Sequence, residues 1–227
     1  MSAIGSRTFS PRREPCRSGK PQTQMTRPLF IVLEGIDGSG TTTQLDRLAS
    51  HLAARGRRVC ATREPSTGPV GRLLRELLMG QHRLPDGAPA DGRAMALLFA
   101  ADRRDHLRRE IEPALAAGMD VVCDRYLLSS LAYQGEEAER DWVGELAREV
   151  RPADLTLLLD LPVSVAAARR HAAGRSEERY DADAVQERVA AAYRKLVAGD
   201  PKAVVVDASL GIEEVTRAIT EEVDRIL

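Results

Sequence analysis

The sequence predicts a single α/β domain in which a mainly parallel five-stranded sheet lies between two layers of helices. Five short apolar segments alternate with longer segments of helical periodicity, which is typical of strands joined by right-handed crossover helices. The chain has 227 residues, of which 43% are hydrophobic. That length supports one well-buried domain and is too short for two large ones.

The segment before the predicted domain, residues 1–27, is rich in Ser, Pro, Gly and Arg and has almost no apolar periodicity. Such a composition buries too little apolar surface to offset the entropy of ordering. We therefore expect a disordered basic extension followed by a domain at 28–227. A solvated tail, a translation start ahead of Met25 and a tail that binds an acidic partner all remain open for this segment.

The first unit of the predicted domain reads as strand, loop and helix. The run LFIVLE from Leu29 is continuously apolar, as in a central parallel strand, and a Gly-rich turn follows it. Leu45, Leu48 and Leu52 then recur at helical spacing up to Gly56, which suits a helix C-terminal cap. Further strands are expected at 58–62, 119–123, 155–160 and 203–207. An apolar stripe marks the last helix: Ile212, Val215, Ile219, Val223 and Ile226.

The charge balance gives no sign of a nucleic-acid or membrane partner. The formal net charge is −1, and both signs are spread along the chain. No stretch approaches the roughly 18 to 20 apolar residues that a membrane helix needs, and the start lacks an apolar signal core. The three cysteines show no metal-ligand spacing. We expect a cytoplasmic protein.

A glycine-rich loop between the first strand and helix resembles the Walker A pattern G-x-x-x-x-G-K-[ST]. It fits at Gly35, Gly40 and Thr42, but Thr41 stands where the lysine belongs. An ordinary tight turn is the alternative. The position after a buried strand favours an ATP site formed by Gly35, Ile36, Asp37, Gly38, Ser39, Gly40, Thr41, Thr42 and Thr43.

The loop keeps most of the phosphate-binding chemistry even without its lysine. Backbone N–H groups can surround a phosphate, the helix beginning near Thr41 adds its positive end, and the Thr42 hydroxyl can ligate Mg²⁺. The missing element is a cation beside the transferring phosphoryl group. Losing a comparable arginine costs about 10³- to 10⁵-fold in rate, which is enough to silence a kinase unless another group supplies the charge.

Several separate segments together resemble the thymidylate kinase family, in the order that this family shows. The resemblance covers about residues 28–227. The segments are LEGIDGSGTTTQ at 33–44, TREP at 62–65, LFAADRR at 98–104, DRYLLSSLAYQG at 124–135, LDLP at 159–162 and GRSEERYD at 174–181. The resemblance implies a P-loop NTPase-type fold and phosphoryl transfer from ATP to dTMP with Mg²⁺. It also implies a homodimer, formed through the helices around 92–117 and 127–149.

Two arginines and two aspartates are candidates for the phosphate region. Arg63 and Arg125 each follow a predicted strand, so both reach the carboxyl edge of the sheet and could grip one monophosphate. The resemblance implies that both contact the dTMP phosphate and that Asp124 supports Mg²⁺ or orients Arg125. It places Asp37 near the acceptor's 3′-hydroxyl and the Mg²⁺ shell, although Asp37 could instead only shape the turn.

The remaining acceptor candidates come from two further segments. Phe99 and Arg103 are four residues apart on a predicted helix and share a face. The resemblance implies that Phe99 stacks on thymine and Arg103 donates to a thymine carbonyl, whereas Phe99 alone would be assigned to the core. It implies that Tyr133 packs on the deoxyribose. Ser130 and Gln134 are polar candidates for the base edge or phosphate, or else structural loop residues.

The charge-dense stretch 169–181 is either a solvated surface or a lid that closes over ATP. Lysine is absent between Lys20 and Lys195, so an arginine must supply any replacement cation. We expect Arg175 or Arg179 to do so, with Arg169 as a weaker candidate. Two alternatives remain: another nucleoside monophosphate or deoxynucleoside kinase, and a non-catalytic nucleotide-binding descendant.

Overall fold

The computed structural model describes residues 27–174 and 179–227. Within these residues all strand pairs of the five-stranded sheet are parallel, and the strand order is β2-β3-β1-β4-β5. The strands are β1 (Phe30–Gly35), β2 (Val59–Arg63), β3 (Asp120–Asp124), β4 (Leu155–Asp160) and β5 (Ala203–Asp207). The predicted fold class and the five predicted strands are confirmed, each strand to within about a residue.

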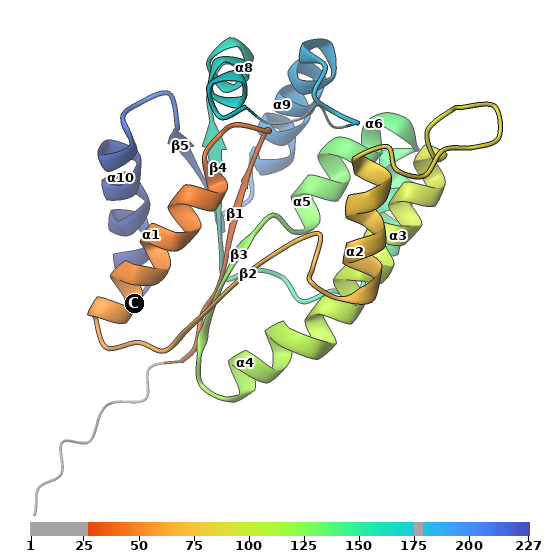
Figure 1. Ribbon diagram of the computed structural model, residues 1–227. Coiled ribbons are helices and arrows are strands. Elements are labelled where there is room, and N and C mark those ends of the chain that lie inside the picture. Colours follow the sequence, from red (N-terminus) through yellow and green to blue (C-terminus); the bar gives the residue numbers. More distant parts are fainter. Residues whose placement is uncertain (1–26, 175–178) are drawn as a thin grey trace, which may run out of the picture.

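Helices cover both faces of the sheet, with α1 and α10 on one side and the segment from α2 to α5 on the other (Figure 1). The α-helices are α1 (Thr41–Ala54), α2 (Pro69–Leu78), α3 (Gly92–His106), α4 (Glu112–Ala116), α5 (Leu127–Ser129), α6 (Gly135–Glu137), α7 (Arg140–Leu146), α8 (Val163–Ala172), α9 (Asp183–Val197) and α10 (Ile212–Asp224). Two π-helical turns interrupt them, η1 (Leu107–Ile111) and η2 (Ser130–Gln134).

Strand β1 lies in the middle of the sheet, and every one of its residues is buried. Because side chains alternate along a strand, β1 feeds two apolar clusters. Ile31 and Leu33 belong to the cluster that contains the leucines of α1, whereas Phe30 and Val32 pack with residues of η1 and α4. Burial on both faces explains the uninterrupted apolar run in the sequence.

The strand order brings the carboxyl ends of β2, β3 and β1 side by side. In the sheet register Arg63 is opposite Asp124, and Leu33 is opposite Asp124 on the other side. The glycine-rich loop, Arg63 and the residues that follow β3 therefore meet at one edge. Open parallel α/β sheets bind ligands at this edge.

The last helix packs as the apolar stripe predicts over its central part. Val215, Ile219 and Val223 are buried, and α10 packs on α1. The expectation is wrong for Ile212 and Ile226, which are 54% and 41% exposed because Ile212 is the first residue of the helix and Ile226 lies beyond its end. Among the described helices, none combines the length and the apolar character needed to cross a bilayer.

Candidate active site

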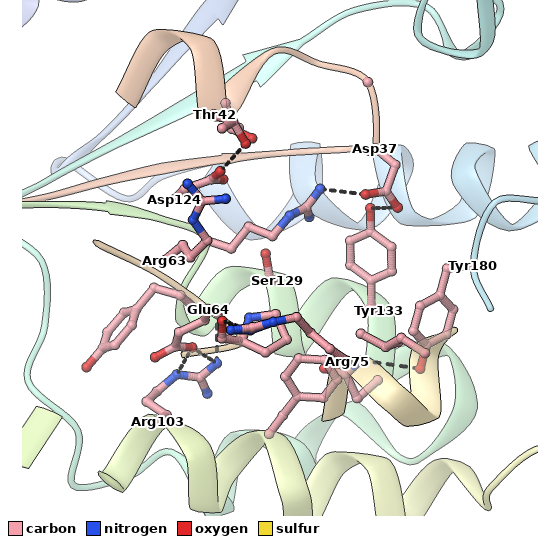
Figure 2. A pocket seen from close by; sticks show the side chains of 18 of the residues that line it. Asp37, Thr42, Arg63, Glu64, Arg75, Arg103, Asp124, Ser129, Tyr133 and Tyr180 are labelled. Atoms are coloured by element: carbon pink, nitrogen blue, oxygen red, sulfur yellow. Dashed lines mark hydrogen bonds and ion pairs between the residues drawn. The ribbon is translucent and has the colours of Figure 1, made fainter. Parts of the chain in front are cut away.

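A cavity of about 450 Å³ opens at the carboxyl edge of the sheet. Figure 2 shows side chains from the glycine-rich loop, from the ends of β2 and β3 and from α3 converging on it. Of the predicted site residues, the cavity brings together Asp37, Gly38, Gly40, Thr41, Thr42, Thr43, Arg63, Phe99, Arg103, Asp124, Arg125, Tyr133 and Gln134. Gly35, Ile36, Ser39 and Ser130 are buried beside it and do not line it.

The glycine-rich loop has the backbone shape that phosphate binding requires. Gly38 and Gly40 have φ values of 90° and 95°, in the left-handed region that favours glycine. A Cβ on Gly38 would also come within 2.5 Å of the Ala166 carbonyl oxygen. Helix α1 begins at Thr41 without a side-chain cap, so its first N–H groups and its positive end can receive an anion.

Asp37 connects the loop to the segment that follows β3 and to α9. Its carboxylate accepts hydrogen bonds from Arg125 Nη2 at 2.9 Å, Tyr133 Oη at 3.1 Å and Gln186 Nε2 at 2.9 Å. Burial raises the pKa of Tyr133, and the nearby Asp37 charge raises it further, so Tyr133 is a neutral donor. Figure 2 shows Tyr133 pointing at Asp37, the carboxylate that Arg125 also contacts.

The two arginines predicted to bind phosphate, Arg63 and Arg125, lie at the ends of the adjacent strands β2 and β3, but their side chains have different contacts. Arg125 has a φ of 70°, and its backbone N–H donates to the Leu33 carbonyl at 2.8 Å. The Arg63 side chain lines the cavity and makes no hydrogen bond or ion pair with any residue that the structure describes. One guanidinium is thus fixed by Asp37, while the other is available to a ligand anion.

Asp124 and Thr42 fit a magnesium ion. The Thr42 hydroxyl donates to Asp124 Oδ2 at 2.6 Å, while Asp124 Oδ1 is buried and has no hydrogen-bond partner among the described residues. Within residues 27–174 and 179–227 there is no group of three or more His, Cys, Asp or Glu side chains that could hold a metal. Mg²⁺ is commonly held by one or two protein groups together with phosphate oxygens and water, so this donor set suits it.

Arg103 is locked beneath the cavity by a buried ion pair. Its Nε and Nη2 atoms donate to Glu64 Oε2 at 3.0 and 2.8 Å, and Nη2 also donates to the Tyr126 carbonyl and the Ser130 hydroxyl. The Arg103 side chain is only 2% exposed. Its Nη1 atom makes no hydrogen bond within the described part of the chain and remains available. Phe99, one turn away on α3, is half-buried and lines the same cavity.

The two serines after β3 have different surroundings. Ser130 lies under the cavity wall as the partner of Arg103, whereas Ser129 lines the cavity. The change from α5 to the π-helical turn η2 falls between these two residues, so their directions do not follow ordinary helical spacing. Gln134 is 1% exposed and donates to the Tyr180 hydroxyl at 3.4 Å.

The two expected lid arginines that the structure describes, Arg169 and Arg179, do not contact the phosphate loop. Arg175 lies outside the described residues. Arg179 pairs with Glu137 through contacts of 3.0 to 3.2 Å, and Arg169 donates to the Ala208 and Leu210 carbonyls. Among the described residues of 169–181, Arg170 contacts the loop: its Nη1 atom donates to the Asp37 carbonyl at 2.6 Å, and its side chain is 8% exposed.

Five supporting residues escape sequence reasoning. They are Glu34, Glu64, Ser129, Arg170 and Gln186. Ser129 lines the cavity, and each of the other four hydrogen-bonds a predicted site residue or the segment that carries one. Three of them are next to predicted residues in the sequence: Glu64 follows Arg63, Arg170 follows Arg169, and Glu34 precedes Gly35. This proximity is the signal by which the sequence could have indicated them. Gln186 lies in a helix far along the chain and carries no such signal.

Comparison with known proteins gives one consistent result. The sequence pattern of the thymidylate kinase family matches residues 33–219. A probable thymidylate kinase of Pyrococcus abyssi is 42% identical over 190 residues, which cover 83% of this chain and 92% of the relative. Thymidylate kinases of Solidesulfovibrio magneticus and Bifidobacterium longum are 39% and 41% identical, covering 88% and 87% of this chain and 100% and 98% of those proteins. The chain belongs to the thymidylate kinase family.

Proposed function

We propose that the chain transfers the γ-phosphoryl group of ATP to dTMP, making dTDP and ADP for dTTP synthesis. The observation that carries this proposal is one cavity with two different halves. A phosphate-binding loop and the start of α1 form the donor half. Arginines at the ends of β2 and β3, with an aromatic ring of α3, form the acceptor half. Phosphoryl transfer depends mainly on such positioning and charge.

On the acceptor side, Arg63 and Arg125 hold the dTMP phosphate. Phe99 stacks on thymine, and Arg103 reads a thymine carbonyl through its remaining Nη1 donor. This assignment is supported by the buried Glu64 pair, which holds Arg103 in one orientation without using all of its donors.

The polar groups around the sugar complete the acceptor half. Tyr133 packs on the deoxyribose, and Asp37 faces the 3′-hydroxyl. Support comes from the hydrogen bond between the Tyr133 hydroxyl and the Asp37 carboxylate, which places both groups at the boundary of the two halves. Gln134 contributes to the wall beside Tyr133, and Ser130 acts through Arg103.

On the donor side, residues 35–43 hold ATP through backbone N–H groups, with Thr42 and Asp124 as the magnesium ligands. Bound Mg²⁺ would neutralise charge on the β- and γ-phosphates. The support is the unpartnered Oδ1 atom of Asp124 beside the Thr42 hydroxyl. Arg125 carries positive charge between the two halves. Arg175 and Arg179 remain our candidates for the further charge that Thr41 does not supply.

An acceptor panel tests the proposed reaction. ADP release is measured with ATP, Mg²⁺ and each of dTMP, dUMP, dCMP and AMP. The thymine methyl group gives about a 10- to 200-fold preference for dTMP over dUMP, corresponding to about 1 to 3 kcal/mol. Equal or higher turnover with AMP or dCMP would instead favour another nucleoside monophosphate kinase. Binding of both nucleotides without turnover would favour a non-catalytic descendant.

We also propose that the protein is a cytoplasmic homodimer that pairs through the helices around 92–117 and 127–149. Leu97 of α3 supports this pairing because it is a large apolar side chain that is 51% exposed. Sedimentation equilibrium tests it. A dimer that dissociates on Leu97→Glu would support the proposed surface, and a monomeric wild type would refute it.

A further inference from the structure

A buried carboxylic acid lies beneath the cavity, and none of the roles proposed above uses it. Glu34 is the second-to-last residue of β1, immediately before the glycine-rich loop, and it is 0% exposed. Both of its oxygens are surrounded by polar groups from the segment that follows Arg125 and from α9. Charged groups are rarely buried to this extent unless they are paired.

The two Glu34 oxygens have different surroundings. Oε1 accepts hydrogen bonds from the backbone N–H groups of Tyr126 and Ser129 at 3.0 and 3.3 Å. Oε2 lies 2.6 Å from the Ser129 hydroxyl and 3.0 Å from the Tyr193 hydroxyl. The Ser129 and Tyr193 hydroxyls are themselves 2.7 Å apart. Oε1 therefore has the partners of a carbonyl oxygen, and Oε2 is one corner of a triangle of oxygens.

The triangle of oxygens needs three protons to form three hydrogen bonds. Its three short O···O contacts each require one proton between the two oxygens. Ser129 and Tyr193 supply one hydroxyl proton each. If Glu34 were ionised, one of the three contacts would have no proton between its two oxygens, and their lone pairs would repel each other. A proton on Oε2 provides the third donor and satisfies all three contacts.

We propose that Glu34 is a protonated, uncharged carboxylic acid in the folded protein and that it acts as a positioning residue for the segment 125–129. The kinetic part of this inference rests on the proposed function, whereas the protonation state does not.

The segment that Glu34 holds is strained and functional. Arg125 has a φ of 70°, a conformation that costs a non-glycine residue free energy and persists only where the surroundings impose it. Glu34 accepts a hydrogen bond from the N–H of Tyr126, the residue after Arg125. It also accepts one from the hydroxyl of Ser129, which lines the cavity. The acid therefore ties the Arg125 backbone to the strand that leads into the glycine-rich loop.

The uncharged form also leaves the Arg125 charge undiminished. Within the described part of the chain, the charged or titratable groups that interact with Glu34 are Cys123 of β3, Arg125 after β3 and Tyr193 on α9. An ionised Glu34 would add a second anion beside Arg125, whose guanidinium already pairs with Asp37. It would also repel the phosphates that the cavity has to receive. Burial raises the pKa of Glu34, in the direction that the proton count requires.

Infrared spectroscopy on wild type and Glu34→Gln tests the protonation state directly. The wild-type protein at neutral pH should show a protonated-carboxyl C=O stretch that shifts in D₂O and is missing from Glu34→Gln. This readout does not depend on which reaction the enzyme catalyses. Absence of the band would overturn the proposal even if dTDP is made.

Kinetics test the positioning role. An amide can accept at Oε1 and donate from Nε2, so Glu34→Gln reproduces the uncharged acid, whereas Glu34→Ala removes every contact. We expect Glu34→Ala to raise the KM for dTMP about 10- to 100-fold and Glu34→Gln to restore it to within about threefold of wild type. If Glu34→Gln is as impaired as Glu34→Ala, or if Glu34→Ala binds dTMP normally, the positioning role is wrong. A wild type that makes no dTDP would refute the proposed function and leave the infrared result standing.

Discussion

The Arg125 guanidinium donates to the Asp37 carboxylate across 2.9 Å, which joins the residue after β3 to the loop after β1. Both side chains are about one-fifth exposed and lie where the two halves of the cavity meet. The pair holds a cation between the expected positions of the donor and acceptor phosphates before either ligand is bound. Catalysis by charge requires such pre-organisation, because a group that is already in place does not reorganise during the reaction.

Removing Arg63 should weaken acceptor binding without affecting folding, because this guanidinium has no partner in the described part of the chain. We expect Arg63→Ala to lower kcat/KM for dTMP about 10- to 100-fold, the equivalent of one or two charge-assisted hydrogen bonds. Steady-state kinetics check this value. Arg217→Ala, an exposed arginine of α10, is the matched control. An unchanged KM for dTMP in Arg63→Ala would rule out the assigned role.

Glu64→Ala should be strongly destabilising because it leaves the Arg103 charge buried without its partner. Both side chains of this pair are at most 3% exposed. Breaking a buried pair costs about 3 to 5 kcal/mol, whereas Glu139→Ala, which breaks an exposed pair with Arg93, should change the free energy of unfolding very little. Urea unfolding measures both. If both variants lose a similar amount of unfolding free energy, the Glu64–Arg103 pair contributes no more to stability than an exposed ion pair, and the prediction is wrong.

The raised pKa of Glu34 predicts how stability changes with pH. Its ordinary value is 4.5, and burial raises it, so above that pH the folded state keeps a proton that the unfolded state releases. The resulting stability is fully present below about pH 4.5 and is lost as the pH rises through the folded-state pKa. The measurement is urea unfolding of wild type and Glu34→Gln over a pH series. The difference in free energy of unfolding, wild type minus Glu34→Gln, should fall as the pH rises. A constant or growing advantage would contradict a raised pKa.

Arg179 tests whether an arginine compensates for Thr41. If its guanidinium leaves Glu137 to reach the transferring phosphoryl group, Arg179→Ala should lower kcat by about 10³-fold. Glu137→Gln separates this role from a structural one, because it breaks the same ion pair and keeps the cation. Arg188→Ala, which loses an exposed pair with Glu136, is the second control. A loss of less than about tenfold in Arg179→Ala, or an equal loss in Glu137→Gln, would refute compensation by Arg179.

The sequence predicts the sheet and the phosphate loop well because local chemistry determines both. A central parallel strand must be apolar throughout, as LFIVLE is, and a left-handed turn favours glycine, as at Gly38 and Gly40. The ends of β2 and β3 were also visible as short apolar runs that finish at Arg63 and Asp124. These signals suffice to place the loop, Arg63 and Arg125 at one edge of the sheet.

The supporting contacts could not be predicted because they depend on tertiary packing. Gln186 reaches Asp37 from a helix that begins almost 150 residues later, and no spacing rule connects the two. Ser129 lines the cavity whereas Ser130 contacts Arg103, and the two residues lie where α5 meets the π-helical turn η2. Arg170, rather than the neighbouring Arg169, turns toward the loop, and adjacent residues on a helix point in different directions. Helical periodicity alone does not predict which of Arg169 and Arg170 contacts the loop.

The central claim is that a phosphate loop with Thr41 in place of lysine still supports phosphoryl transfer. The most direct measurement is chromatographic detection of dTDP from the purified full chain with ATP and dTMP, in Mg²⁺ and again after the metal is removed with EDTA. We expect dTDP and ADP in equal amounts with Mg²⁺ and neither without it. Binding of ATP and dTMP by calorimetry with no dTDP formed in Mg²⁺ would contradict the claim.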